Sequence, residues 1–166
     1  AVTIDNGLAY VGASDHTFRA IDIHTGKVLW KYGEVKGYIE TKPLITDNKV
    51  IFGAWDNTLY ALNKNDGKEI WKWTGGLTRM HFSPAAVWPV AAEGKVFIAD
   101  PQRALTAIDL ENGKTVWRTF ESQVRETVGL SEDGKQIYSK TMNDSIVCFA
   151  TQGDEPKKLW ASNVGF

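Results

Sequence analysis

The sequence lacks several features that would have assigned a function directly. It holds one cysteine, Cys148, which excludes an internal disulfide. Lysine and arginine number 19 against 20 acidic residues, so there is no basic surface of the kind that attracts nucleic acid. The longest apolar stretch, residues 84–92, contains two prolines and is far too short to cross a bilayer. The sequence therefore predicts neither nucleic-acid binding nor a transmembrane segment.

Patterns typical of catalysis and metal binding are also missing. The three histidines, His16, His24 and His81, show neither the His-x-His nor the His-Glu-x-x-His spacing. No glycine-rich loop could cradle a phosphate, and no Gly-x-Ser-x-Gly segment could present a nucleophilic serine. We therefore predict no catalytic residue, no cofactor-binding residue and no metal ligand in this chain.

What the chain does contain is an internal repeat. In each copy Ala-Ile-Asp or a close variant precedes a turn with Gly-Lys, and a tryptophan follows the glycine by four residues, in segments 20–30, 61–71 and 107–117. A degraded fourth copy covers 148–160, where seven residues separate the glycine from the tryptophan. The four tryptophans lie 41, 46 and 43 residues apart. A unit of this length is typical of one β-propeller blade.

Short runs of β-branched and aromatic residues, broken by turn signals, predict strands throughout and no convincing helix. For the second unit we expect strands near 39–45, 49–54, 58–63 and 69–73. The fold class predicted is all-β, a propeller of four-stranded antiparallel blades, with four blades present. The blades should cover approximately residues 1–34, 35–75, 76–120 and 121–166, so that the repeat segment spans 1–166.

The repeat resembles the pyrroloquinoline-quinone (PQQ)-like, or quinoprotein alcohol dehydrogenase-like, propeller family. The motifs quoted above carry this resemblance, and they cover essentially the whole chain. The chain is also similar to the propeller of the β-barrel assembly lipoprotein, a non-catalytic scaffold. The resemblance implies a ring of seven or eight blades within a larger bacterial protein, and a place in the periplasm or cell envelope.

One tryptophan in each unit is expected to pack between neighbouring blades. An aromatic residue that recurs once per blade buries a large flat surface, about 150–250 Å² each. Repetition is what the architecture requires, so we interpret these residues as structural docking residues: Trp30, Trp71, Trp117 and Trp160. An open half-ring would expose two blade faces, which favours self-association.

A binding site is expected where the innermost strands and the loops that lead into them form one mouth of the central channel. The unusual residues there, together with a tryptophan outside the repeat pattern, are the predicted contacts with a protein or peptide partner: Glu40, Trp55, Met80, His81, Phe82, Arg125 and Glu126. Trp88 also lies outside the repeat pattern and is either a core residue or a further contact.

The function we expect is a non-catalytic scaffold for protein or ligand interaction. An alternative is a fragment of a PQQ-dependent dehydrogenase, for which the resemblance implies a quinone held by calcium, a stacking tryptophan and a pair of adjacent cysteines. A single cysteine cannot form that pair, so we predict no cofactor. A third hypothesis is a regulatory tail, because segments 87–90 and 124–126 look similar to propeller tails of phosphoesterase- or kinase-related proteins.

Overall fold

The computed structural model describes residues 1–75 and 87–165, and it shows four antiparallel sheets of four strands each. Within these two ranges the chain forms strands and turns but no helix, hence no helix that could cross a membrane. The all-β propeller prediction is therefore confirmed. The predicted contacts Met80, His81 and Phe82 lie outside the described residues.

Each sheet is a meander, in which strands that follow one another in the chain are hydrogen-bonded neighbours. The first sheet comprises β1 (Val2–Asp5), β2 (Leu8–Gly12), β3 (Phe18–Asp22) and β4 (Val28–Tyr32). The second comprises β5 (Leu44–Ile45), β6 (Lys49–Gly53), β7 (Thr58–Asn63) and β8 (Glu69–Thr74). The third comprises β9 (Val90–Ala92), β10 (Lys95–Ala99), β11 (Leu105–Asp109) and β12 (Thr115–Thr119). The fourth comprises β13 (Val124–Leu130), β14 (Gln136–Thr141), β15 (Ser145–Ala150) and β16 (Lys158–Asn163).

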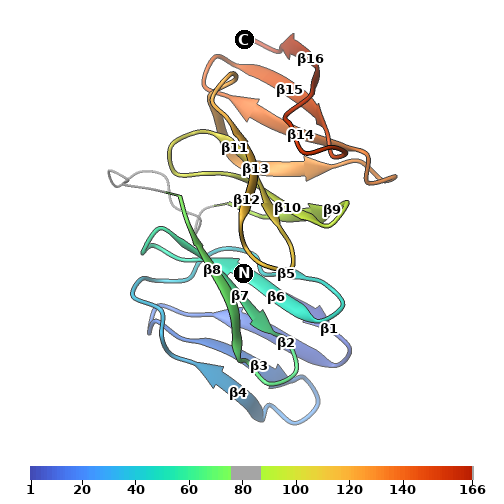
Figure 1. The fold of residues 1–166 in the computed structure, drawn as a ribbon. Coiled ribbons are helices and arrows are strands. Elements are labelled where there is room, and N and C mark those ends of the chain that lie inside the picture. The colour runs from blue at the N-terminus through green and yellow to red at the C-terminus, as the bar shows by residue number, and fades with distance from the viewer. Residues whose placement is uncertain (76–86, 166) are drawn as a thin grey trace.

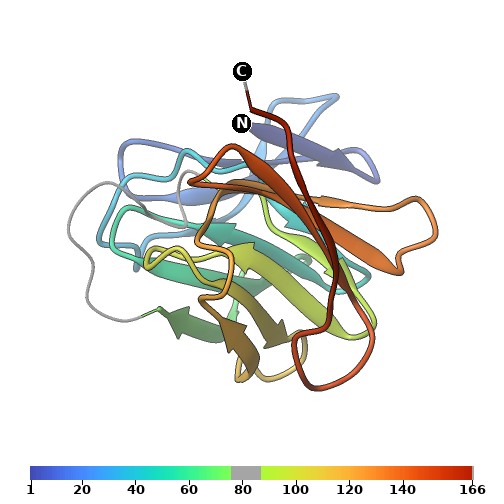
Figure 2. The same cartoon turned by 90° about the horizontal axis from the view of Figure 1, so that it is seen from above.

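The four sheets follow one another in chain order as the blades of a propeller. Figure 1 shows them from the blue first sheet at the bottom to the red fourth sheet at the top. Seen from above, in Figure 2, the strands of the fourth sheet cross those of the first at an angle. Each sheet is therefore turned relative to the sheet before it, as expected when twisted sheets pack face to face.

Apolar residues that alternate along the inner strands fill the space between blades. One core joins the first two sheets, where the rings of Phe18 and Phe52 stack with centroids 4.0 Å apart. A second core joins the second, third and fourth sheets. The strands β6 and β10 are buried along their whole length, because a central strand of an inner blade is covered on both faces.

Candidate functional site

The tryptophans at the repeat position connect the first sheet to the second, and the second to the third, in the same way. Trp30 Nε1 donates a hydrogen bond of 3.0 Å to the carbonyl of Lys64, and Trp71 Nε1 donates one of 3.0 Å to the carbonyl of Leu110. Both acceptors belong to the turn between the third and fourth strands of the next sheet, which we call the glycine turn. Its glycine lies directly under the indole ring.

Glycine is required in these turns for two reasons. Gly67 and Gly113 adopt φ angles of +72° and +71°, which L side chains rarely adopt. A Cβ atom at Gly67 would lie 2.5 Å from the Trp30 ring, and one at Gly113 would lie 2.7 Å from the Trp71 ring. The glycine thus permits both the turn and the close approach of the indole.

A second contact repeats beside the first, and the sequence analysis missed it. The Tyr32 hydroxyl donates a hydrogen bond to the Glu69 carboxylate, and Trp73 Nε1 donates one of 2.9 Å to Thr115 Oγ1. Each donor lies two residues after a docking tryptophan, and each acceptor begins the last strand of the next sheet. The signal was present, since an aromatic residue stands two positions after both Trp30 and Trp71.

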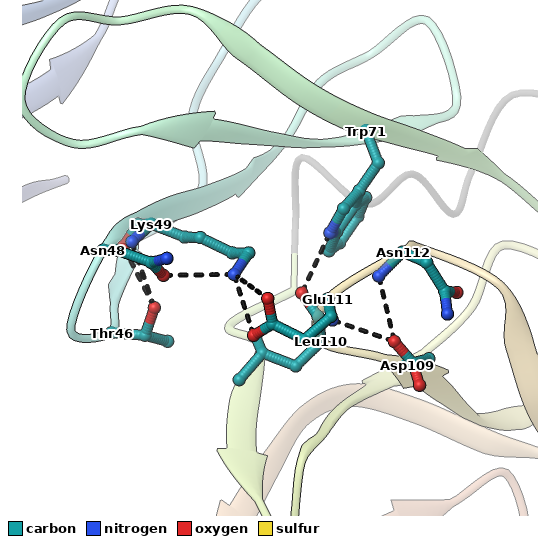
Figure 3. Close-up of polar contacts among 8 residues, drawn as sticks. All are labelled: Thr46, Asn48, Lys49, Trp71, Asp109, Leu110, Glu111 and Asn112. Carbon is teal, nitrogen blue, oxygen red and sulfur yellow. Dashed lines mark hydrogen bonds and ion pairs between the residues drawn. The ribbon is translucent and has the colours of Figure 1, made fainter.

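A buried lysine reinforces the contact between the second and third sheets. The Lys49 side chain is 1% exposed, and its ammonium group lies 2.8 Å from a carboxylate oxygen of Glu111 (Figure 3). Figure 3 also shows Trp71 bonded to Leu110, the residue before Glu111. The carboxylate and the tryptophan acceptor therefore come from one glycine turn, which binds two residues of the preceding sheet.

The other two docking tryptophans behave differently. Trp117 is buried next to Phe97 and Phe149, with ring centroids 5.8 and 6.5 Å away. Its Nε1 atom has no hydrogen-bond acceptor among the described residues. Trp160 is 44% exposed, so the expectation that it packs between two blades does not hold within this chain. Among the described residues no further sheet packs against its ring.

The predicted mouth is formed by one edge of the sheets. Because successive strands run in opposite directions, the turn between the second and third strands lies at the same edge as the segment that leads to the next sheet. At this edge residues 33–43 connect β4 to β5, and the turn 54–57 connects β6 to β7. We call residues 33–43 the connecting segment.

The connecting segment is not a strand, and its backbone bends at residues 36–37 and 41. The sequence analysis placed a strand from residue 39, whereas β5 begins only at Leu44. From Glu34 to Pro43 the side chains alternate strictly between exposed and buried, with the buried positions at residues 35, 37, 39, 41 and 43. The exposed positions form a row that alternates in charge around an aromatic residue, and we call it the mouth row: Glu34, Lys36, Tyr38, Glu40 and Lys42.

Asp56 and Gly37 hold the connecting segment against the second sheet. The Asp56 carboxylate accepts hydrogen bonds from the Lys36 amide at 2.9 Å and from the Tyr60 hydroxyl at 2.5 Å. Burial, and then this bond to Asp56, raises the pKa of Tyr60 above its ordinary value. A Cβ atom at Gly37 would lie 2.4 Å from the Asp56 amide nitrogen, so glycine alone permits this close approach.

Two of the predicted contacts, Glu40 and Trp55, come together at this edge. Trp55 Nε1 donates a hydrogen bond of 3.0 Å to the Glu40 carboxylate, and the Trp55 amide donates one of 2.9 Å to the carbonyl of Tyr38. The Tyr38 ring in turn lies 5.1 Å from the His16 ring. Tyr38 is 51% exposed and Trp55 is 39% exposed, so both present large aromatic surfaces to solvent.

The mouth row continues toward the propeller axis. The Lys42 ammonium lies 5.3 Å from the centroid of the Trp88 ring, and Thr41 donates a hydrogen bond to the carbonyl of Val87. Lys42 and Trp88 line an axial groove of about 310 Å³, to which the first strand of every sheet contributes. The residues that line it are Thr3, Lys42, Pro43, Leu44, Ile45, Trp88, Pro89, Val90 and Val128.

The remaining predicted contacts lie on another blade. Arg125 and Glu126 belong to β13 in the fourth sheet, where the register with β14 shifts between Arg125 and Val128. The structure therefore brings Glu40 and Trp55 together and places Arg125 and Glu126 in a different sheet. Sequence reasoning also placed Tyr38 among the candidates at the mouth, but it did not indicate that Tyr38 would be the central residue of the mouth row.

The groove does not fit a calcium-bound quinone. Its lining includes no carboxylate, and calcium requires several oxygen ligands of which carboxylates are the strongest. Among the described residues no three histidine, cysteine, aspartate or glutamate side chains are placed to hold a metal ion. Cys148 is buried within the fourth sheet, and burial raises the pKa of its thiol.

Solved structures share this architecture. BamB from Moraxella catarrhalis superposes with a TM-score of 0.72 at 22% identity, over 97% of this chain and 47% of that chain. Quinohemoprotein alcohol dehydrogenase from Comamonas testosteroni gives 0.79 at 21% identity, over 98% and 34%. The computationally designed Ika8 protein gives 0.80 at 15% identity, over 98% and 48%. At these identities the likeness shows the fold alone, and the chain spans about half or less of each of these proteins.

Comparison with protein families is more specific. No curated protein matches the chain. A PQQ-like repeat family model described as outer membrane protein assembly factor BamB matches residues 1–164, which is nearly the entire chain. The predicted family resemblance is thereby confirmed, and the chain belongs to the BamB family of PQQ-like β-propeller proteins.

Proposed function

We propose that the chain is a non-catalytic interaction module whose mouth row binds an extended polypeptide segment. The observation that carries this proposal is the connecting segment, where exposed side chains alternate with buried ones and place two charged pairs around Tyr38. Trp55 adds a second exposed aromatic surface, fixed by Glu40. Tyrosine and tryptophan are enriched at the centre of protein-binding surfaces, which are surrounded by a polar rim.

The fixed backbone of the connecting segment supports this function more strongly than the exposure of its side chains does. The backbone of the connecting segment is held by Asp56 and by the close approach at Gly37, so a partner need not order it on binding. A preorganised surface loses little conformational entropy when a partner binds, and affinity increases accordingly. The family description points to partners among outer-membrane protein chains, and we propose the cell envelope as the place of action.

Titration with unfolded peptides from outer-membrane β-strands, followed by calorimetry, tests the proposal. Trp55→Ala should weaken binding by roughly tenfold or more, because hot-spot aromatics contribute at least that much. Leu29→Ala is the matched control, since Leu29 is an exposed apolar residue at 50% and lies in β4 outside the mouth row. Equal loss in both variants, or no loss in Trp55→Ala, would refute the role of the mouth row.

The alternative, a fragment of a quinoprotein dehydrogenase, rests on the structural likeness to such enzymes. It predicts tight binding of PQQ in the presence of calcium, whereas the carboxylate-free lining of the groove predicts none. Calorimetric titration of the chain with PQQ and calcium distinguishes the two. A stoichiometric heat signal would favour the enzyme fragment over the interaction module.

A further inference from the structure

A pocket of about 220 Å³ lies between the third and fourth sheets, apart from the mouth row. Its walls come from the segment between β12 and β13, the turn between β14 and β15, and the adjoining parts of β15 and β16. Val147 and Ala161 pair across these last two strands and therefore share one face, on which Val147 packs into the core shared with the third sheet. We call this hollow the turn pocket.

The other three sheets fill the corresponding place with their own side chains. In every sheet the turn between the second and third strands contains a residue with positive φ, and we call the residue before it the turn acceptor. In the first three sheets a long side chain of the same sheet donates a hydrogen bond to the turn acceptor: Arg19 to Asp15, Tyr60 to Asp56 and Arg118 to Gln102. Each of these turns is therefore tied to a strand of its own sheet.

The turn acceptor of the fourth sheet is Asn143, and its side chain has no such donor. Asp144, which follows it, has a φ angle of +50°. The Asn143 backbone amide donates to Thr141 Oγ1 at 3.2 Å, and its carbonyl accepts a hydrogen bond of 3.3 Å from Ser145. No hydrogen bond joins the side-chain carboxamide to any residue that the structure describes. An acceptor that is used in three sheets is therefore available in the fourth.

Short side chains in the fourth sheet create the hollow. Tyr60 and Val147 each lie one residue before the partner of a docking tryptophan, so they hold the same position in their sheets. Tyr60 pairs with Lys72, whose ammonium lies 5.5 Å from the centroid of the Tyr60 ring, whereas Val147 pairs with Ala161. The fourth sheet thus has an isopropyl and a methyl group where the second has a phenol ring and a lysine.

The charges around the turn pocket favour a phenol over a guanidinium group. Each guanidinium at the corresponding places contacts a carboxylate, as Arg118 contacts Asp100 at 2.5 Å. The carboxylate among the residues that line the turn pocket is Glu121, and the Lys158 ammonium already binds it. A buried guanidinium needs a counter-charge, whereas a hydroxyl group needs only a neutral acceptor such as the Asn143 carboxamide oxygen.

We propose that the turn pocket binds the phenol ring of a tyrosine in a polypeptide partner. The ring packs against Val147 and Ala161, and its hydroxyl donates a hydrogen bond to Asn143, as the Tyr60 hydroxyl does to Asp56 at 2.5 Å. A tyrosine buries a large apolar surface while its hydroxyl keeps a polar partner, which suits a hollow with an apolar wall and a polar rim. The site is independent of the mouth row, which lies between the first and second sheets.

Titration of the isotope-labelled chain with N-acetyl-tyrosinamide, followed by NMR, tests the proposal. The backbone amide signals of Asn143, Ser145 and Val147 should shift, with the millimolar dissociation constant expected of so small a ligand. N-acetyl-phenylalaninamide should bind roughly fivefold more weakly, because it lacks the hydroxyl. N-acetyl-argininamide should shift none of these signals. Equal binding of the phenylalanine compound, or tighter binding of the arginine compound, would overturn the proposal.

A capped peptide with one tyrosine between glycines distinguishes a polypeptide ligand from a free phenol. The peptide should shift the same three amide signals at least as strongly as N-acetyl-tyrosinamide does. Shifts caused by N-acetyl-tyrosinamide but not by the peptide would overturn the assignment to a polypeptide partner.

Asn143→Ala removes the proposed acceptor and keeps the backbone contacts of the turn. The variant should bind N-acetyl-tyrosinamide roughly fivefold more weakly than the wild type, and its affinity for N-acetyl-phenylalaninamide should not change. Asn65→Ala is the matched control, because Asn65 is also exposed but lies in the turn between β7 and β8, at the opposite edge of the sheets. A loss of the same size for both ligands would contradict the role of the hydroxyl.

Val147→Tyr fills the turn pocket with a phenol ring of the chain itself. Because Val147 corresponds to Tyr60, the new ring should occupy the place of the ligand and donate to Asn143. The folded variant should no longer respond to N-acetyl-tyrosinamide, and its unfolding midpoint should lie above that of Val147→Phe, which lacks the hydroxyl. Binding that persists in folded Val147→Tyr would overturn the proposal. If the larger side chain prevents folding, Asn143→Ala still decides the question.

Discussion

Between the second and third sheets, Trp71 both covers Gly113 and donates a hydrogen bond to the carbonyl of Leu110. Between the third and fourth sheets, Trp117 is equally buried, at 5% exposure against 6% for Trp71. Its Nε1 nevertheless has no acceptor among residues 1–75 and 87–165. The two indoles are thus buried to the same extent, but only Trp71 donates a hydrogen bond to the next sheet.

The length of the glycine turn explains the difference. The third sheet closes its turn with a hydrogen bond from Asp109 to Lys114, whereas the fourth closes its turn from Ala150 to Lys157. The longer turn leaves the carbonyl of Thr151, the counterpart of Leu110, to the Lys95 ammonium at 3.4 Å. The indole is therefore buried at both of these contacts, and turn length decides whether it is hydrogen-bonded.

Replacing each indole by phenylalanine measures this difference directly. Trp71→Phe and Trp117→Phe both lose ring volume, but only Trp71→Phe leaves a turn carbonyl without its donor. We expect Trp71→Phe to lower the free energy of unfolding by about 1 kcal/mol more than Trp117→Phe, from a total of about 2–4 kcal/mol. Urea denaturation followed by circular dichroism measures both values. Equal losses would mean that the hydrogen bond contributes nothing.

The ion pair between the buried Lys49 and Glu111 is a charged contact between the second and third sheets, beside the uncharged contact of Trp71. Glu111→Gln removes the carboxylate that binds Lys49 but keeps its shape, so a buried ammonium loses its counter-charge. Because the Glu111 side chain is 73% exposed, solvent screens the pair, and we expect a loss of only about 1 kcal/mol. Glu132→Gln is the control, since Glu132 is exposed and no ion pair is seen for it among the described residues. Urea denaturation of both variants should show the loss in Glu111→Gln alone.

The architecture was predictable because it is periodic. Tryptophans such as Trp71 and turn glycines such as Gly113 recur, and repetition reveals four-stranded units without any knowledge of their contacts. The seven-residue separation of Gly153 and Trp160 also indicated the longer fourth turn. It did not indicate that Trp117 would lack a hydrogen bond, because the carbonyl that could accept one belongs to the neighbouring sheet.

The candidate site was predictable only in part, because it depends on contacts that do not repeat. Glu40 and Trp55 were both expected at the mouth, but their hydrogen bond depends on where the connecting segment crosses the second sheet. That course is set by Gly37 and Asp56, and neither belongs to the repeat motif. Lys49 and Glu111 are 62 residues apart, and no spacing rule joins them.

Alkaline pH tests whether the first contact between blades differs from the third. Burial, and then the hydrogen bond to Glu69, raises the pKa of Tyr32 above its ordinary value of about 10. The third contact differs, because Lys158, which begins β16 as Glu69 begins β8, donates a hydrogen bond to Glu121.

Because the folded state binds the Tyr32 proton more tightly than the unfolded state does, its contribution to stability is complete below pH 10 and decreases as the pH rises further. Thermal unfolding of the wild-type chain should therefore show a midpoint that falls as the pH rises above 10. Tyr32→Phe, which cannot ionise, should flatten this decrease, and the slope it removes should not exceed about 1.4 kcal/mol per pH unit. An unchanged slope in Tyr32→Phe would show that the Tyr32 proton does not stabilise the contact between the first two blades.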